Sequence, residues 1–280
     1  MKKVRDYFKK LRIAIKMEIR DNKRSFCVYW ILRLLVLIVL VLQLLNHNYE
    51  NVFMCILTLL LLIVPSFVQT TFHVELPTTL EILIYLFIFA AEILGEIDHY
   101  YLKYEFWDTM LHTINGFLAA AIGYSLVTLL NKNEKIQFSL SPMFTAVVAF
   151  CFSMTIGVCW EFFEFSMDTF FGMDTQKDTF INAIHSVSLS PDGSMTTLEG
   201  IKNVVVDGQV LSTQGYLDIG LVDTMGDLFV NFIGAFIFSV LGFFFTKTKG
   251  KGKIARRFIP RKKSEDRDYY NQVFKEEADE

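Results

Sequence analysis

The sequence predicts an all-α, polytopic membrane protein with about six transmembrane helices and a polar pocket toward the outer face of the membrane. Composition is the first reason: the 280 residues are 52% hydrophobic and include 28 Phe, which is unusual for a soluble domain. Apolar runs are the second, because six of them approach twenty residues, enough to cross a bilayer of about 30 Å as a helix. The third reason is charge, because basic residues gather near both ends of the chain.

The six apolar runs define the expected spans. A transmembrane barrel would show short alternating segments instead, so the runs favour helices. The third, fourth and sixth runs carry polar residues at one end, which leaves their boundaries soft. The runs cover residues 27–45, 51–69, 79–97, 109–130, 143–168 and 223–246.

Basic residues also predict the orientation. Residues 1–24 hold ten Lys or Arg against three acids, and residues 247–263 hold nine without an acid. Basic flanks stay in the cytoplasm, so both termini are expected on the cytoplasmic side of a bacterial cytoplasmic membrane. An even number of spans allows this arrangement. The short loop with Lys132 and Lys135 then lies inside, and the long loop 169–222 lies outside.

Three regions follow from these spans. Residues 1–25 form a basic cytoplasmic segment, either an amphipathic helix on the anionic inner leaflet or a solvated tail. Residues 26–246 form the membrane domain, including the extracytoplasmic loop 169–222. Residues 247–280 form a charged cytoplasmic tail, expected to be disordered beyond residue 264.

The outer loop is too long to be a bare connection. Residues 204–211 read as two short strands around the turn Asp207-Gly208, and residues 178–187 as a short helix or strand. His73 and His185 are expected to be isolated loop residues.

Polar residues at helical spacing mark three of the spans. Under the predicted orientation they all lie in the outer half of the membrane or at its outer surface. A carboxylate inside a bilayer helix costs about 2.5–3.5 kcal/mol on insertion scales, so three such helices suggest one shared site. The three stripes are Asp108, His112, Asn115 and Gly116; Glu161, Glu164 and Asp168; and Asp223, Asp227, Asn231 and Gly234.

Each stripe occupies one face of its helix. At about 100° per residue, the polar positions of each stripe fall within roughly 60–80° of one another. Lipid-facing carboxylates are unfavourable, so each face should turn toward the protein interior. Gly116 and Gly234 lie on these faces, where small residues let helices approach closely.

The chemistry of the stripes admits several uses. Clustered carboxylates suit Mg²⁺, Mn²⁺ or Ca²⁺, or Zn²⁺ if a histidine joins them. We expect such an ion to be held by Glu161, Glu164, Asp223 and Asp227. Without an ion, some of the carboxyl groups would have to stay protonated. A hydrogen-bonded network that only pins helices together is the structural alternative.

For function, the first hypothesis is a metal-dependent enzyme acting on an envelope or lipid-linked substrate at the outer face. Its expected catalytic residues are His112, Asp108 and Glu161, with His112 or Glu161 moving a proton and Asp108 one helical turn from His112. The second hypothesis is a transporter that uses the acids as a cation or proton site. The third is a non-catalytic membrane or envelope-stress protein. The acids lie toward one face and no inverted repeat is seen, which favours the enzyme.

The ordered motifs resemble a known group. Asp108-x-x-x-His112, Glu161-x-x-Glu164 and Asp227-x-x-x-Asn231-x-x-Gly234 look like the polar motifs of VanZ-like membrane proteins, although those usually carry Gln at the position of Glu164. The Trp-Glu-x-x-Glu variant and the additional Asp223 look closer to the YjdF-type family of uncharacterised bacterial inner-membrane proteins. The resemblance covers about residues 75–245. It implies membrane placement and, through the association of VanZ-like members with glycopeptide tolerance, envelope chemistry.

Overall fold

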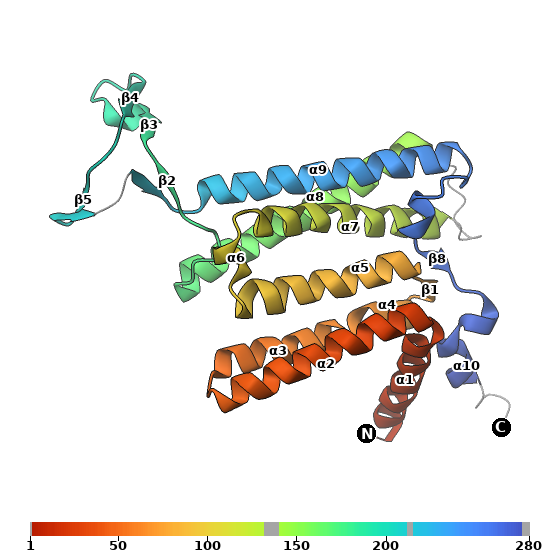
Figure 1. Cartoon of the computed structure of the whole chain (residues 1–280). Coiled ribbons are helices and arrows are strands. Elements are labelled where there is room, and N and C mark those ends of the chain that lie inside the picture. Colours follow the sequence, from red (N-terminus) through yellow and green to blue (C-terminus); the bar gives the residue numbers. More distant parts are fainter. Residues whose placement is uncertain (1, 132–139, 212–214, 276–280) are drawn as a thin grey trace. The chain divides into compact units, whose positions relative to one another are not determined.

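The computed structural model describes residues 2–131, 140–211 and 215–275 of the chain (Figure 1). Two compact units are distinguished by their internal contacts. Unit 1 comprises Met1–Met154 and Asn231–Glu280, and unit 2 comprises Thr155–Val230. The unit boundaries fall inside two long helices, so each of these helices contributes one part to each unit.

Helices make up the first half of unit 1. Asn22 and Asn48 cap two of these helices with their side chains, because such residues satisfy the free N–H groups of a first turn. Pro65 lies in the first turn of α4, where its missing N–H costs little. The elements are α1 (Lys2–Asp21), α2 (Lys23–Leu45), α3 (Tyr49–Leu61), α4 (Val64–Thr71), β1 (Val74–Glu75), α5 (Thr78–Phe89), the π-helix η1 (Ala90–Ile97), α6 (Tyr100–Lys103) and α7 (Phe106–Asn131).

One apolar core joins α2, α3 and α5, which pack along one another (Figure 1). These helices also present large apolar side chains outward, as expected of helices in contact with lipid. The buried residues of this core are Tyr29, Leu32, Val36, Cys55, Leu62, Tyr85 and Ile93.

The rest of unit 1 contains parts of α8 (Pro142–Phe171) and α9 (Leu221–Lys247), followed by the C-terminal elements η3 (Ala255–Arg257), β8 (Arg261–Lys262), η4 (Glu265–Arg267) and α10 (Tyr269–Lys275). A second core joins α7, α8 and α9 through small side chains. Alanines allow close helix packing in a membrane-type interface, where van der Waals contact replaces the hydrophobic effect. Its buried residues include Ala120, Ala121, Tyr124, Ala149, Ala235 and Phe238.

The C-terminal segment corrects the expectation of a disordered tail. β8 pairs antiparallel with β1, with Val74 opposite Lys262 and Glu75 opposite Arg261. η4 and α10 follow, and α10 packs on α1. Composition alone predicted disorder because the segment is polar, whereas its partners β1 and α1 lie in the first third of the chain. Residues 276–280 lie outside the described part.

Unit 2 by itself holds the C-terminal part of α8, the N-terminal part of α9 and the long loop between them. The loop contains the predicted hairpin, with β5 (Val204–Val206) and β6 (Gln209–Leu211) flanking Asp207 at φ 49° and Gly208 at φ 78°. Residues 178–187 contain strands, so the strand alternative is confirmed. The other elements are β2 (Thr179–Ile181), β3 (Ala183–Ser186), η2 (Val187–Leu189), β4 (Thr196–Glu199) and β7 (Tyr216–Asp218), with β2 paired to β7 and β3 to β4.

Within the described ranges, five helical segments are long and apolar enough to cross a membrane: 23–45, 49–71, 106–129, 142–171 and 221–247. The remaining expected span, 79–97, corresponds to α5 and η1, which follow each other without a break but change helix type at Ala90. The polytopic all-α class is therefore confirmed. Lys132 and Lys135 lie outside the described residues. The orientation and the three region boundaries stay predictions.

Candidate functional site

Three helices carry the residues expected to form the site, and two of them, α7 and α9, have an acid in the first turn. Asp108 lies in the first turn of α7 and Asp223 in the first turn of α9. A carboxylate is favoured there, because the free N–H groups and the helix dipole attract negative charge. The first turn of each helix therefore stabilises its own acid, with or without a bound ligand.

Asn231 joins the three helices inside unit 1. Its side chain is fully buried. Its amide oxygen accepts a hydrogen bond from Asn115 Nδ2 on α7 at 3.4 Å, and its Nδ2 donates to Met154 Sδ on α8 at 3.6 Å. Close by, Ser153 Oγ on α8 donates to the main-chain oxygen of Gly116 at 2.7 Å. The stripes of α7 and α9 therefore meet at Asn115 and Asn231.

Two glycines allow α7 and α9 to cross at this junction. A Cβ added to Gly116 would overlap the main-chain oxygen of Asn231, and one added to Gly234 would overlap the main-chain oxygen of Thr113. Backbone atoms cannot rotate away as side chains do, so any larger residue would push the helices apart. The expectation that both glycines serve close approach is confirmed.

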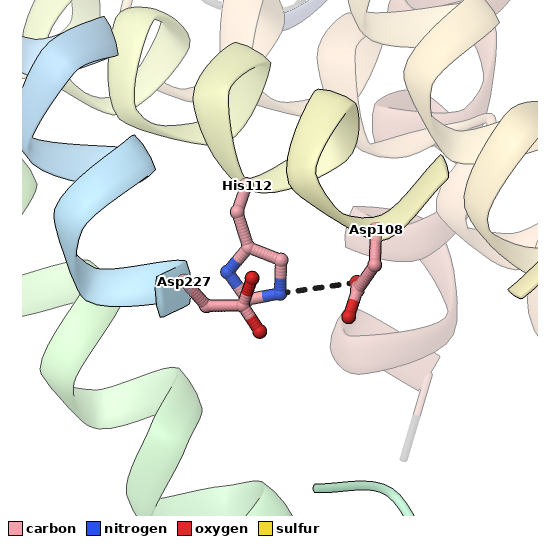
Figure 2. A group of neighbouring side chains, drawn as sticks. All are labelled: Asp108, His112 and Asp227. Atoms are coloured by element: carbon pink, nitrogen blue, oxygen red, sulfur yellow. Dashed lines mark ion pairs between the residues drawn. The ribbon is translucent and has the colours of Figure 1, made fainter. Parts of the chain in front are cut away.

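Asp108 and His112 form a pair on α7, one turn apart. His112 Nε2 lies 3.4 Å from Asp108 Oδ1, as the dashed line in Figure 2 marks. The His112 side chain is buried, and Asp108 is partly exposed. A carboxylate beside one ring nitrogen holds the imidazole in one orientation and favours a proton on that nitrogen.

Unit 2 shows an inverted distribution of polar and apolar side chains. On α8, Glu161 is 5% exposed, whereas its neighbours Phe162 and Phe163 are 65% and 51% exposed. On α9, Asp227 is 5% exposed, whereas Phe229 is 64% exposed. A helix in water would bury the phenylalanines and expose the acids. These helices therefore have lipid-type outer faces and hold their carboxylates inside.

Two of the predicted site acids hold the loop. Asp168 accepts hydrogen bonds from the main-chain N–H groups of Thr175 at 2.6 Å and Gln176 at 2.8 Å, and from the Thr175 hydroxyl at 2.5 Å. Asp223 Oδ2 accepts from the main-chain N–H of Lys177 at 2.8 Å. These bonds attach residues 175–177 to the ends of α8 and α9. Asp168 thus has a structural role in holding the loop. Asp223 has the same structural role, beside its predicted role as a metal ligand.

The other expected site residues are distributed over the two units. Unit 1 holds Asp108 and His112, which lie together. Unit 2 holds Glu161 and Asp227, which are buried, and Glu164, which is half-buried on the same face of α8 as Glu161. The catalytic and metal-binding roles of these residues stay predictions.

A second polar cluster, which the sequence did not reveal, joins the two ends of unit 1. The buried Lys263 pairs with the buried Glu18 of α1, and Arg267 pairs with Asp21 and with Glu75. His73 Nδ1 lies 3.0 Å from Asp268, so the expectation that His73 is isolated is wrong. His185 is not isolated either: it lies in strand β3, and its Nδ1 is 2.9 Å from the Thr197 hydroxyl oxygen.

The same cluster surrounds a small polar pocket lined by Glu18, Asp21, Asn22, Gln69, Glu75, Leu76, Glu81 and Arg267. Burial raises the pKa of Glu18 to about 7, although the hydrogen bond from Lys263 opposes the shift. Burial would also raise the pKa of Asp21, but hydrogen bonds from Tyr269 and Arg267 outweigh it and lower that pKa. The partners are separated by up to about 250 residues in sequence, which no local pattern can reveal.

Comparison with known proteins places the chain among membrane proteins. Residues 28–248 match the family described as "Predicted membrane protein (DUF2238)". A protein of Thermotoga maritima described only as uncharacterized is 28% identical over 116 residues, which cover 40% of this chain and 58% of that protein. The matched part thus spans little more than half of that relative's length. No solved structure matches. The resemblance to the YjdF-type and VanZ-like groups stays a prediction. The family match covers more than three quarters of the chain and both units, and the chain therefore belongs to the DUF2238 family of predicted membrane proteins.

Proposed function

We propose that the polar residues of α7, α8 and α9 bind a divalent cation, and that the protein is a metal-dependent enzyme acting on an envelope or lipid-linked substrate at the predicted outer face. One observation carries this proposal. Glu161 and Asp227 are buried in helices whose phenylalanines are exposed. A membrane helix that hides carboxylates and shows aromatic rings to lipid is built around a polar interior.

Charge balance is the first step. Burying an ionised carboxylate is costly unless a counter-charge or a proton accompanies it. A divalent cation with oxygen ligands balances several carboxylates at once. The candidate ligands are Glu161, Glu164, Asp223 and Asp227. Asp223 also accepts a bond from Lys177, and a carboxylate has enough lone pairs for both tasks.

Helix continuity supports the meeting of these residues. Asn115, Gly116, Ser153 and Asn231 join α7, α8 and α9 at one level. A helix rises about 1.5 Å per residue, so Asp227 lies about one turn from Asn231 along α9, and His112 lies less than one turn from Asn115 along α7. Glu161 lies about two turns beyond Ser153 on α8. In unbroken helices, each of these three residues lies within about two turns of that junction.

His112 and Asp108 would supply proton chemistry. A proton on His112 Nε2, held by Asp108, leaves the lone pair on Nδ1, which could ligate a cation or accept a proton from a substrate or water. Asp108 and His112, drawn in Figure 2 with Asp227, offer a carboxylate and an imidazole of the kind that ligate a metal, as do the carboxylates of Glu161 and Glu164. A bound cation would supply Lewis acidity toward an anionic substrate group.

Metal-dependent stability tests the cation. Purified full-length protein is heated with and without Mg²⁺, Mn²⁺, Ca²⁺ or Zn²⁺, beside Asp227→Asn and the control Asp207→Asn. Asp207 lies at an exposed hairpin turn, where Asn fits equally well. An ion at a hundred times its Kd stabilises the folded state by about 2.7 kcal/mol. We expect wild type and Asp207→Asn to gain this stability and Asp227→Asn to lose most of it. Equal behaviour of all three proteins would contradict the cation.

Turnover of membrane lipids tests the enzyme. Wild type, His112→Gln and Asp207→Asn are incubated with total bacterial lipid extract and the stabilising cation, and products are followed by mass spectrometry. We expect a new product with wild type and Asp207→Asn but little with His112→Gln. Cation binding without a product, together with cation flux into vesicles, would favour the transporter instead. If neither a product nor a cation flux were detected, the result would favour a non-catalytic protein.

Basic residues near both ends of the chain also bear on its placement in the membrane. We propose a bacterial cytoplasmic membrane, both termini inside, and contact of the basic terminal segments with anionic lipid. The charge bias of residues 1–24 and 247–263 supports it. Ser194→Cys in the loop should react with an impermeant maleimide from outside cells, above the background of the wild-type cysteines. Labelling only after the cytoplasm is opened would contradict this orientation.

A further inference from the structure

The first helix, α1, packs one of its faces against the rest of unit 1. Leu11, Ala14 and Glu18 are buried on that face, where α1 packs against α4 and α10. Tyr7 also meets Phe274 of α10, with ring centroids 5.5 Å apart. The apolar side of this amphipathic helix is therefore engaged by protein and is not the side that meets other molecules.

The opposite face is a basic stripe. At about 100° per residue, its five basic residues fall within about 80° of one another. All five are exposed, and Phe8 and Ile13, which flank the stripe, are 61% and 42% exposed. The stripe consists of Arg5, Lys9, Arg12, Lys16 and Arg20.

The acids of α1 are kept away from this stripe. Glu18 pairs with Lys263, and Asp21 accepts hydrogen bonds from Arg267 and Tyr269 of the C-terminal segment. The remaining acid, Asp6, lies 3.9 Å from Lys10. The C-terminal segment thus neutralises two acids on the protein side, which leaves the outward side of α1 dominated by positive charge.

The position of α1 places the stripe beside the membrane. Asn22 alone separates α1 from α2, and its extended backbone turns the chain between them. Figure 1 shows α1 running across the end of α2 rather than continuing along it. If α2 crosses the membrane from Lys23 onward, as its length and apolar composition allow, then α1 would lie along the membrane surface for about 30 Å. The exposed Lys23 and Arg24 continue the positive charge at the start of α2.

We propose, resting on the anionic-lipid contact proposed above for the basic terminal segments, that the basic stripe of α1 is the docking surface for anionic lipid headgroups of the adjacent leaflet. The contact is electrostatic, because the apolar face is occupied by α4 and α10. Phe8 and Ile13 add apolar contacts beside the charges. The C-terminal segment holds α1 in the orientation that presents the stripe, so the two ends of the chain form one lipid-binding element.

Hydrogen exchange on the full-length protein tests this surface. The protein is placed in nanodiscs of phosphatidylcholine alone, or of phosphatidylcholine and phosphatidylglycerol at about 7:3, and protection of the α1 amides is measured. Each basic residue near an anionic surface contributes about a fivefold effect. We expect at least tenfold greater protection of α1 in the anionic discs, lost in about 1 M salt because salt screens the contact.

Two variants with equal charge loss identify the stripe. Lys9→Gln, Arg12→Gln and Lys16→Gln together should abolish most of the gain. Lys249→Gln, Lys251→Gln and Lys253→Gln, in the exposed segment after α9, should leave the protection of α1 unchanged. Equal protection of wild-type α1 in both discs would overturn the proposal, as would an unchanged gain in the first variant. Protection by soluble polyglutamate but not by phosphatidylglycerol would overturn it in favour of an acidic protein partner.

Discussion

Replacement of Gly116 by alanine probes the packing that underlies the site. The new methyl group would overlap the main-chain oxygen of Asn231, so α7 and α9 must separate. Overpacking costs about 1–3 kcal/mol, while the change from Gly to Ala in a helix gains up to about 1 kcal/mol. We expect Gly116→Ala to lower the free energy of unfolding by about 1–2 kcal/mol, and Gly234→Ala to behave similarly because it meets Thr113.

The matched control lies on the same helix as Gly234. A Cβ added to Gly226 meets nothing within 4 Å, so Gly226→Ala keeps the helix gain without the overlap. The free energy of unfolding would be measured by reversible unfolding in mixed micelles with increasing denaturing detergent. Gly226→Ala should exceed Gly116→Ala in stability by about 1–3 kcal/mol. If Gly116→Ala were as stable as Gly226→Ala, the close crossing of α7 and α9 would be refuted.

Three further predictions concern groups outside that crossing. The pKa of Glu18 is raised to about 7 from 4.5, so its contribution to the free energy of unfolding is fully present below about pH 4.5 and is lost as pH rises through 7. Glu18→Gln should remove up to about 3 kcal/mol of this pH dependence of stability. If the thermal stability of Glu18→Gln changed with pH as steeply as that of wild type, this prediction would be contradicted. Asp168→Ala removes three hydrogen bonds and should speed amide exchange of residues 175–177 about tenfold or more, whereas rates equal to wild type would show that the loop is held otherwise. Arg267→Ala should expose residues 261–275 to limited proteolysis through loss of two ion pairs, while Arg261→Ala, whose side chain is exposed, should not. Equal cleavage of the two variants would argue that the ion pairs of Arg267 do not hold the C-terminal segment.

Hydropathy and helical spacing predicted the part of the fold that depends on local sequence. The apolar runs gave the long helices, because a bilayer demands continuous apolar length. The helical spacing of the polar residues predicted that Asn115 and Asn231 would face the interior. It also predicted that Gly116 and Gly234 would let helices approach closely. It also predicted that Glu161 and Asp227 would be buried. Each of these follows from the cost of exposing a polar group to lipid.

Contacts between distant segments were not predictable in this way. The pairs Glu18–Lys263 and His73–Asp268 join residues 245 and 195 positions apart, and no periodicity links them. The C-terminal segment was therefore mistaken for a disordered tail. Asp168 was counted with the site because it shares the face of Glu164. Its actual partners are backbone N–H groups, whose positions depend on the conformation of the loop.

Metal content measures the central proposal most directly. Full-length protein purified without chelator is analysed for bound elements as wild type, as Glu161→Gln and as the control Glu199→Gln, an exposed acid of the long loop. The proposed site predicts about one divalent ion per chain in wild type and Glu199→Gln, and markedly less in Glu161→Gln. Absence of divalent metal from wild type, with no thermal stabilisation by added Mg²⁺, Mn²⁺, Ca²⁺ or Zn²⁺, would contradict the metal site and leave protons to balance the buried carboxylates.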